Sequence, residues 1–270
     1  MLYEIILIYF LTGALAGFVS GLFGVGGAFT MAPALIIGLP LQGVPNEHVM
    51  HLSAGTALGV MAATSAYVAV LRYRTGDLQL TVTLRFVPFI VIGATAGSIF
   101  GDYLPGDVLR AIFMGFIGVA ILRGIFYKGH ETVAAGGDLH NVRGISLWLH
   151  GTLTGITGSL LGPGPAMIIA PYLRSHRYSM PMVAASCSAL AGIVGLASAG
   201  GYIFGGFDET GLPSLAFGYL YGPAFAGLAV GAIFGSPGGV KISHRISDLL
   251  IHRMFIGYLT LILIVMIIWG

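Results

Sequence analysis

Charged side chains are scarce in this sequence of 270 residues. Asp, Glu, Lys and Arg together make up 8% of it and hydrophobic residues 56%, whereas soluble domains contain about 25% charged residues. So few charges cannot cover the surface of a water-soluble domain. The formal net charge of +2 gives no indication of a nucleic-acid partner, and none is expected.

Cysteine occurs once, at Cys187, which excludes an internal disulfide and any metal site built from several cysteines. All ten acidic residues fall at expected loops or helix ends. Their placement argues against a carboxylate proton relay or a carboxylate cation site inside a membrane. HExxH and Walker A motifs are missing too. We therefore expect no cofactor, no metal site and no enzymatic activity.

Long apolar segments recur along the chain, and a helix needs about 20 apolar residues to cross a bilayer. The alternating pattern of a membrane β-barrel is missing. The first segment lacks a positively charged start and is too long for a signal peptide. The sequence predicts an all-α polytopic protein, embedded in the lipid bilayer of a cell (inner or plasma) membrane, with about 8–10 segments: Leu2–Phe23, Ala28–Leu39, Val49–Leu71, Phe86–Phe100, Val108–Phe126, Gly144–Leu161, Ala166–Leu173, Met182–Phe204, Leu215–Phe234 and Leu249–Trp269.

Positive charges gather in four of the connections. They are Arg72, Arg74 and Arg85; Arg123, Lys128 and Arg143; Arg174 and Arg177; and Lys241, Arg245 and Arg253. By the positive-inside rule these connections face the cytoplasm, and the arginines are interpreted as anchors. The linker at 129–143 is then cytoplasmic and both termini are extracytoplasmic.

Two stretches of the chain resemble each other. Residues 21–35 read GLFGVGGAFTMAPAL and residues 159–173 read SLLGPGPAMIIAPYL. The similarity predicts two transmembrane repeats, 1–128 and 144–270, joined by the linker 129–143. Each half holds five segments, an odd number, so the halves have inverted topology. Each repeat would combine a broken or re-entrant helical hairpin with three spanning helices, a pattern typical of secondary transporters.

Glycines at Gly24, Gly26 and Gly27 permit a sharp turn, after which a short helix would start near Ala28. The second copy turns at Gly162 and Gly164, and a helix would start near Ala166, with Pro165 suited to its first turn. Two helix amino ends near the middle of a membrane form an anion site. Pro33 and Pro171 would kink or end the short helices. The alternative is that glycines pack helices together, as we expect for Gly13-xxx-Gly17-xxx-Gly21 and Gly93-xxx-Gly97-xxx-Gly101, whose ridges could also serve a homodimer.

The stretches GLFGVGGAFTMAPAL followed by HLSAGTAL, and GSLLGPGPAMIIAPYL followed by AASCSAL, resemble the two motif pairs of the sulfite exporter TauE/SafE family. The resemblance covers 10–125 and 144–268. It implies a transporter of small sulfur-containing oxyanions, such as sulfite, sulfonates like sulfoacetate, and thiosulfate. The family's second motif, a small residue followed by Thr-Ser, reads Gly55-Thr56-Ala57 and Ser186-Cys187-Ser188 here. Both copies depart from Thr-Ser.

The expected substrate-binding residues are therefore Gly24, Gly26, Gly27, Ala28, Thr56, Ala57, Gly162, Gly164, Ala166, Ser186, Cys187 and Ser188. His51 and His150 are candidates for proton coupling, because histidine changes charge near neutral pH; the alternative is that they are packing residues. The expected function is transport of a small anion by alternating access. Transport of another organic anion, an anion channel and a membrane-embedded enzyme remain alternatives.

Overall fold

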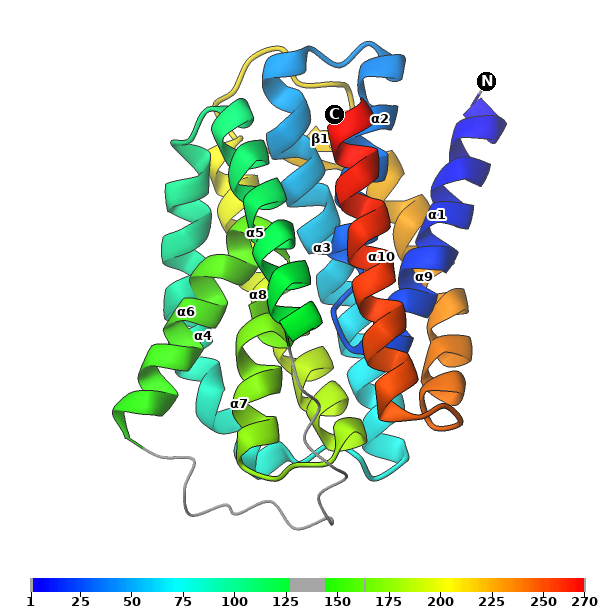
Figure 1. Ribbon diagram of the computed structural model, residues 1–270. Coiled ribbons are helices and arrows are strands. Elements are labelled where there is room, and N and C mark those ends of the chain that lie inside the picture. Colours follow the sequence, from blue (N-terminus) through cyan, green and yellow to red (C-terminus); the bar gives the residue numbers. More distant parts are fainter. Residues whose placement is uncertain (1, 127–143, 163, 270) are drawn as a thin grey trace.

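The computed structural model describes residues 2–126, 144–162 and 164–269 of the chain (Figure 1). Its helices are α1 (Leu2–Phe23), α2 (Ala28–Gly38), α3 (Asn46–Arg74), α4 (Leu80–Asp102), α5 (Gly106–Phe126), α6 (Ile145–Leu161), α7 (Ala170–Ser175), α8 (Met180–Gly205), α9 (Gly222–Ser243) and α10 (Asp248–Trp269). A 3-10 turn, η1 (Pro40–Gln42), follows α2, and a π-helical turn, η2 (Pro165–Ile169), precedes α7. Two short strands, β1 (Ala216–Phe217) and β2 (Leu220–Tyr221), form a hairpin before α9.

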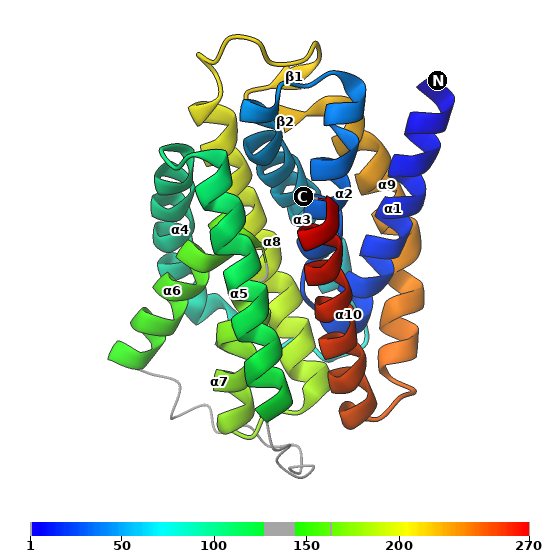
Figure 2. The same ribbon diagram turned by 45° about the horizontal axis from the view of Figure 1, so that its top comes forward.

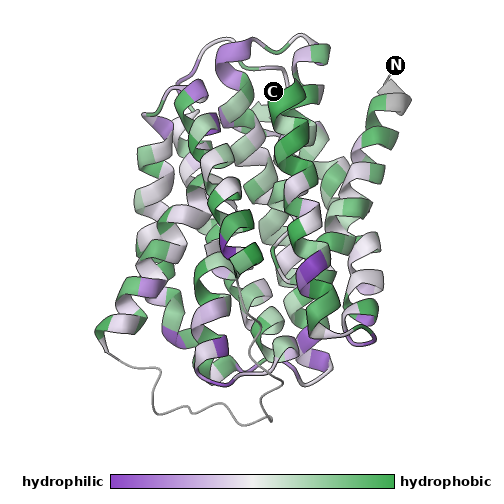
Figure 3. Cartoon of the chain, viewed as in Figure 1, coloured by the Kyte–Doolittle hydropathy of each residue, from purple (hydrophilic) through white to green (hydrophobic). Residues whose placement is uncertain are grey.

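Within the described residues, seven helices are long and apolar enough to cross a membrane: α1, α3, α4, α5, α8, α9 and α10. Their outward faces carry large exposed apolar side chains, among them Leu11, Leu122 and Phe234. Figure 3 shows the apolar colouring along the length of the bundle, with many of the most polar residues toward its two ends. Such a surface suits lipid tails, and the prediction of an all-α polytopic membrane protein is confirmed.

The first and last helices share one end of the bundle, since α1 begins where α10 ends (Figures 1 and 2). We call this the termini end. The opposite end, where α5 ends and α6 begins, is the linker end. α1 therefore descends from the termini end and α2 returns to it, whereas α6 rises from the linker end and α7 returns there.

Most helices lie within a few residues of their expected bounds, but the ninth does not. The expected span Leu215–Phe234 is wrong: the β-hairpin occupies its start, and α9 runs from Gly222 to Ser243. Pro223 stands in the first turn of α9, where its missing N–H costs nothing. The stretch after Phe234 contains Gly235 and Pro237 and reads as a loop, yet it stays helical because it packs along α1.

The glycine ridges bring two pairs of helices into backbone contact. A methyl group at Gly17 of α1 would collide with the backbone of Ala232 on α9, and one at Gly235 would collide with Ala14. Helices α4 and α6 meet in the same way, at Gly93 against Thr152. The prediction that these ridges are packing faces is confirmed. Because they are occupied within one chain, they offer no surface to a second copy.

A substitution at Gly17 tests this packing. We expect Gly17→Ala to lower the melting temperature in detergent, because forcing a methyl group into a filled interface costs about 1–3 kcal/mol. Gly115 of α5 is the matched control, since a Cβ there meets no other atom within 4 Å. Gly115→Ala should leave the melting temperature unchanged or slightly raised. Equal melting temperatures for the two variants would contradict the assignment.

Candidate functional site

The first helix break lies between α1 and α2. Gly24, Gly26 and Gly27 have φ angles of 72°, 86° and 77°. These values lie in the left-handed region, which residues other than glycine seldom adopt. A Cβ at Gly24 would lie 2.6 Å from the carbonyl oxygen of Ala184 on α8, and one at Gly26 would lie 2.6 Å from Cγ of Met61 on α3. The break is therefore enclosed by α3 and α8. Protein enclosure is the condition under which backbone can leave the helix at membrane depth.

The second break lies between α6 and η2. Gly162 has a φ of 92°, and η2 begins at Pro165 and passes into α7 at Ala170. Pro171 follows at once; because it has no N–H for a normal helical bond, the wider π-helical turn beside it is expected. In the first half, α2 continues through Pro33 to Gly38, so proline does not end that helix.

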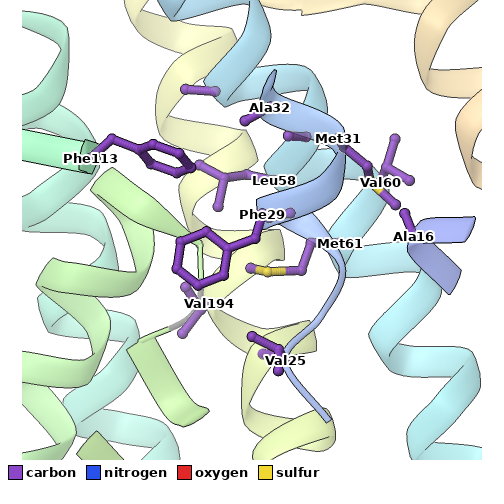
Figure 4. Close-up of a cluster of buried hydrophobic side chains, with 14 of the residues drawn as sticks. Ala16, Val25, Phe29, Met31, Ala32, Leu58, Val60, Met61, Phe113 and Val194 are labelled. Atoms are coloured by element: carbon purple, nitrogen blue, oxygen red, sulfur yellow. The ribbon is translucent and has the colours of Figure 1, made fainter. Parts of the chain in front are cut away.

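The two breaks touch. A Cβ on Gly162 would lie 2.6 Å from Cβ of Ala28, the first residue of α2. The void beside this contact, toward the termini end, has a volume of about 10 Å³ and is lined by Ala28, Ala57 and Phe113, among others. One water needs about 10–15 Å³ and polar partners, so this apolar void does not let water or an anion pass in this conformation. Figure 4 shows the apolar side chains that fill the region, with Phe29 of α2 beside Phe113.

A cavity of about 520 Å³ lies on the other side of the breaks, toward the linker end, where Arg123, Arg174 and Met180 line it. Val25 of the first break, Ala166 of the second and Cys187 of α8 lie at its inner end. The walls come from η2, α5, α7, α8 and α10 and are mostly apolar, with Met167 and Phe255 among them. A cavity of this size accommodates a small organic molecule.

Basic side chains mark this cavity. Arg123 of α5, Arg174 of α7 and His252 of α10 line it, and none of its described lining residues is Asp or Glu. Nη1 of Arg174 donates to the carbonyl oxygen of Tyr178 at 3.3 Å, and Nε2 of His252 lies 3.0 Å from the carbonyl oxygen of Gly124. Basic side chains attract anions and repel cations.

The structure places nine of the twelve expected binding residues at the cavity, at the small void or in the helix breaks. Ala166 and Cys187 line the cavity, and the Cys187 thiol points at the carbonyl oxygen of Pro165 at 3.4 Å. Ala28, Ala57 and Gly162 line the small void instead. The backbone breaks themselves are formed by Gly24, Gly26, Gly27, Gly162 and Gly164.

The hydroxyl groups expected to bind the anion have protein partners in this conformation. Oγ1 of Thr56 accepts a hydrogen bond from the backbone N–H of Tyr221 at 2.9 Å. Ser186 Oγ accepts from Thr83 at 3.2 Å, and Ser188 donates to the carbonyl oxygen of Ala184 at 2.8 Å. None of the three lines the cavity.

The β1–β2 hairpin covers the termini end of α3. Its Tyr219 is buried, with its ring centroid 5.0 Å from that of His51, and its backbone carbonyl leaves no room for a Cβ on Gly55. Burial, with smaller contributions from Glu209 and Asp102, raises the pKa of Tyr219 to about 12, so this phenol stays neutral at physiological pH. Together with the apolar void, the hairpin closes the termini end of the protein.

The two candidate histidines lie apart. His51 is buried at the termini end of α3, where Nε2 has no hydrogen-bond partner among the described residues. His150 lies on α6, in the half nearer the linker end, where Nδ1 is 2.7 Å from the carbonyl oxygen of Ser146 and the ring packs on Tyr172. The structure does not unite them in one proton path.

Sequence reasoning missed several residues that the structure places at the site. His252 sits in the last helix, with no motif around it, and Tyr219 sits in a segment that was expected to be helical. Arg72 and Arg74 received the same interpretation as surface anchors, yet Arg72 is completely buried and Arg74 is exposed. Residues two positions apart in a helix point to different sides of it, and this was the one signal in the sequence that Arg72 and Arg74 could differ in burial.

A metal site was not expected, and within the described residues no group of three or more His, Cys, Asp or Glu side chains could hold a metal ion. The chemistry on display is a basic, largely apolar cavity ending at two helix breaks. Such an arrangement can bind an anion.

A model of the sulfite exporter TauE/SafE family matches residues 9–266. A probable membrane transporter protein of Haemophilus influenzae is 25% identical over 97% of this chain and 98% of its own length. The probable membrane transporter protein MJ0441 of Methanocaldococcus jannaschii is 24% identical over 88% of this chain and 86% of its own length. No solved structure matches the chain. Because the family match runs from within α1 almost to the end of α10, the protein belongs to the sulfite exporter TauE/SafE family of membrane transporters.

Proposed function

We propose that this protein is a secondary transporter that moves small sulfur-containing oxyanions, such as sulfite, sulfoacetate or thiosulfate, across the cell membrane. One observation carries the proposal: the cavity that ends at both helix breaks is lined by Arg123, Arg174 and His252 and by no described acidic residue. An anion entering at the linker end would pass these basic groups first. It would then reach the inner end of the cavity, between Val25 and Ala166, where the short helices begin.

The proposed mechanism is alternating access between two inverted repeats. The opposite directions of α1–α2 and α6–α7 (Figure 1) support this symmetry. So does the exchange of partners, in which α1 packs on α9 and α6 packs on α4. The described conformation would be the one open at the linker end. In the other conformation the Ala28–Gly162 contact and the β-hairpin would open and the cavity would close.

The placement of charge supports a cytoplasmic linker end. Arg74, Arg177 and Lys241 lie at that end of the bundle, at the ends of α3, α7 and α9, and positive residues favour the cytoplasmic side. Both termini would then be extracytoplasmic. The membrane would be the plasma membrane of the cell, or the inner one where there are two.

A channel is the second candidate, and transport assays separate the two. In proteoliposomes loaded with unlabelled sulfite, a carrier accelerates uptake of labelled sulfite by exchange, whereas a channel does not. The apolar void beside Gly162 favours the carrier, because its lining offers an anion no polar surface. The same vesicles serve for a panel of sulfite, thiosulfate, sulfoacetate, taurine, sulfate and a carboxylate.

Removing a cavity arginine should weaken anion binding. We expect Arg174→Gln to raise the Kd for the tightest-binding member of that panel about tenfold, because charge-assisted hydrogen bonds contribute roughly 1.5–3 kcal/mol. Isothermal titration calorimetry on detergent-purified protein measures this. Arg245 is the control: it is exposed near the same end and does not line the cavity. A Kd that rises equally in Arg245→Gln and Arg174→Gln would place the effect outside the cavity.

Filling the cavity should stop transport without unfolding the protein. Ala170 lines the cavity, and Ala170→Phe places a ring where the anion would move. We expect at least a tenfold lower rate of uptake into proteoliposomes. Ala111→Phe, on the exposed face of α5, should transport at the wild-type rate. Normal uptake by folded Ala170→Phe would exclude this cavity as the route.

His51 should control the pH dependence of transport. When protonated, it would be attracted to Asp102 and to Glu209 beside Tyr219, which would hold the hairpin closed; Glu47 and His48 lie on the same helix. We therefore expect acidification to slow wild-type transport. His51→Ala should flatten that decline, and His150→Ala should keep it. If His51→Ala kept the pH dependence of wild-type transport, His51 would have no part in closing the termini end.

A further inference from the structure

Arg72 is the one Asp, Glu, Lys or Arg side chain among the described residues that is fully buried, with 0% of it exposed. It lies in the last turn of α3, near the linker end. Burying a charge in a protein within a membrane is expensive unless other groups compensate it. A buried arginine there therefore needs an explanation that Arg74, exposed two residues later, does not.

The contacts of Arg72 lead to the first helix break. Its Nη2 donates to the carbonyl oxygen of Gly21 at 2.7 Å and to Oγ of Ser243 at 3.3 Å. Its Nη1 lies 4.0 Å from Oδ2 of Asp77, which is 16% exposed. That carboxylate also accepts from Thr75 and lies 3.2 Å from Nε2 of His244. One network thus joins α1, the ends of α3 and α9, and the α3–α4 connection.

The strongest of these contacts holds the carbonyl end of α1. The last carbonyls of a helix have no partner within it and carry a partial negative charge. Gly21 lies three residues before Gly24, where the chain leaves the helix. In broken-helix transporters such a carbonyl end is a place where a sodium ion is coordinated. Here a guanidinium occupies that position.

The second half has no counterpart. α8, which stands in the second half where α3 stands in the first, contains no charged residue between Met180 and Gly205. The backbone bond at the two breaks is the same: the N–H of Gly162 donates to Gly158 at 2.7 Å, and that of Gly24 donates to Ser20 at 2.8 Å. The countercharge is therefore specific to the first break.

We propose that Arg72 is the positioning residue of the first helix break: its guanidinium acts as a built-in cation on the carbonyl end of α1, holds Gly24–Gly27 in its cavity-lining conformation and replaces a metal cation there. This inference rests on the proposed anion transport, because the break matters to function only if the cavity beside Val25 binds the substrate. It assigns Arg72 no contact with the anion.

Three variants separate positioning from simple stability. Arg72→Gln removes the charge and leaves Asp77 with Thr75 and His244 as its remaining partners. Arg72→Gln combined with Asp77→Asn removes both charges, so that no carboxylate is left without its arginine. Arg74→Gln is the matched control on the same helix end. Each purified variant is measured for its melting temperature and for its Kd for sulfite, sulfoacetate and thiosulfate.

We expect Arg72→Gln to lower the melting temperature and to raise the Kd at least tenfold. The double variant should regain most of the melting temperature while its Kd stays raised, because the carbonyl end of α1 still lacks its donor. Arg74→Gln should match the wild type in both measurements. A wild-type Kd in the double variant would overturn the proposal, since Arg72 would then serve charge balance alone.

Two further measurements complete the test. If both glutamine variants fail to fold, Arg72→Lys takes their place, because lysine keeps the charge but lacks the planar set of N–H donors of a guanidinium. We expect its Kd to rise at least threefold. An unchanged Kd would overturn the proposal. Replacing Na⁺ by choline should leave the wild-type Kd unchanged, and a requirement for Na⁺ would contradict the built-in cation. If the wild type binds none of the three anions, the proposed function fails rather than the role of Arg72.

Discussion

Two interrupted helices can lie inside a bilayer only when other parts of the protein surround their backbone, and the rest of this structure follows from that constraint. Met61 of α3 and Ala184 of α8 enclose the first break, and the second break rests on the first at Ala28. Glycines let α1 approach α9, and α4 approach α6, closely enough to build that enclosure. Packing and function therefore share one origin: backbone contacts that only glycine allows.

The two ends of the protein differ in chemistry. At the linker end a basic cavity reaches the breaks, with arginines on α5 and α7. At the termini end an apolar void and the β1–β2 hairpin close the structure, with Tyr219 packed on His51. The two breaks also differ, because Arg72 holds the first and the Cys187–Pro165 contact accompanies the second. The two helix breaks therefore have different side-chain surroundings.

Much of the fold could be predicted because strong signals dominate it. The length of the apolar segments predicts the spans, and the glycine-rich stretches predict the breaks. At both breaks the structure has glycines with positive φ, Gly24 and Gly162. The remainder depends on tertiary contact. The stretch around Pro237 stays helical only because α1 packs beside it. At the site, the glycines of the breaks were predictable, but Arg72 and Arg74 differ by burial alone, and His252 enters the cavity through the crossing of α10 with α5. Composition and spacing do not encode such crossings.

The central claim is that an anion binds at the inner end of the cavity, against both helix breaks. X-ray diffraction from crystals grown with selenite, a sulfite analogue with anomalous scattering, tests it most directly. We expect an anomalous peak beside Val25 and Ala166, within hydrogen-bonding distance of backbone N–H groups at the start of α2 or of η2–α7. A peak confined to the surface, or one at the termini end with none in the cavity, would contradict it.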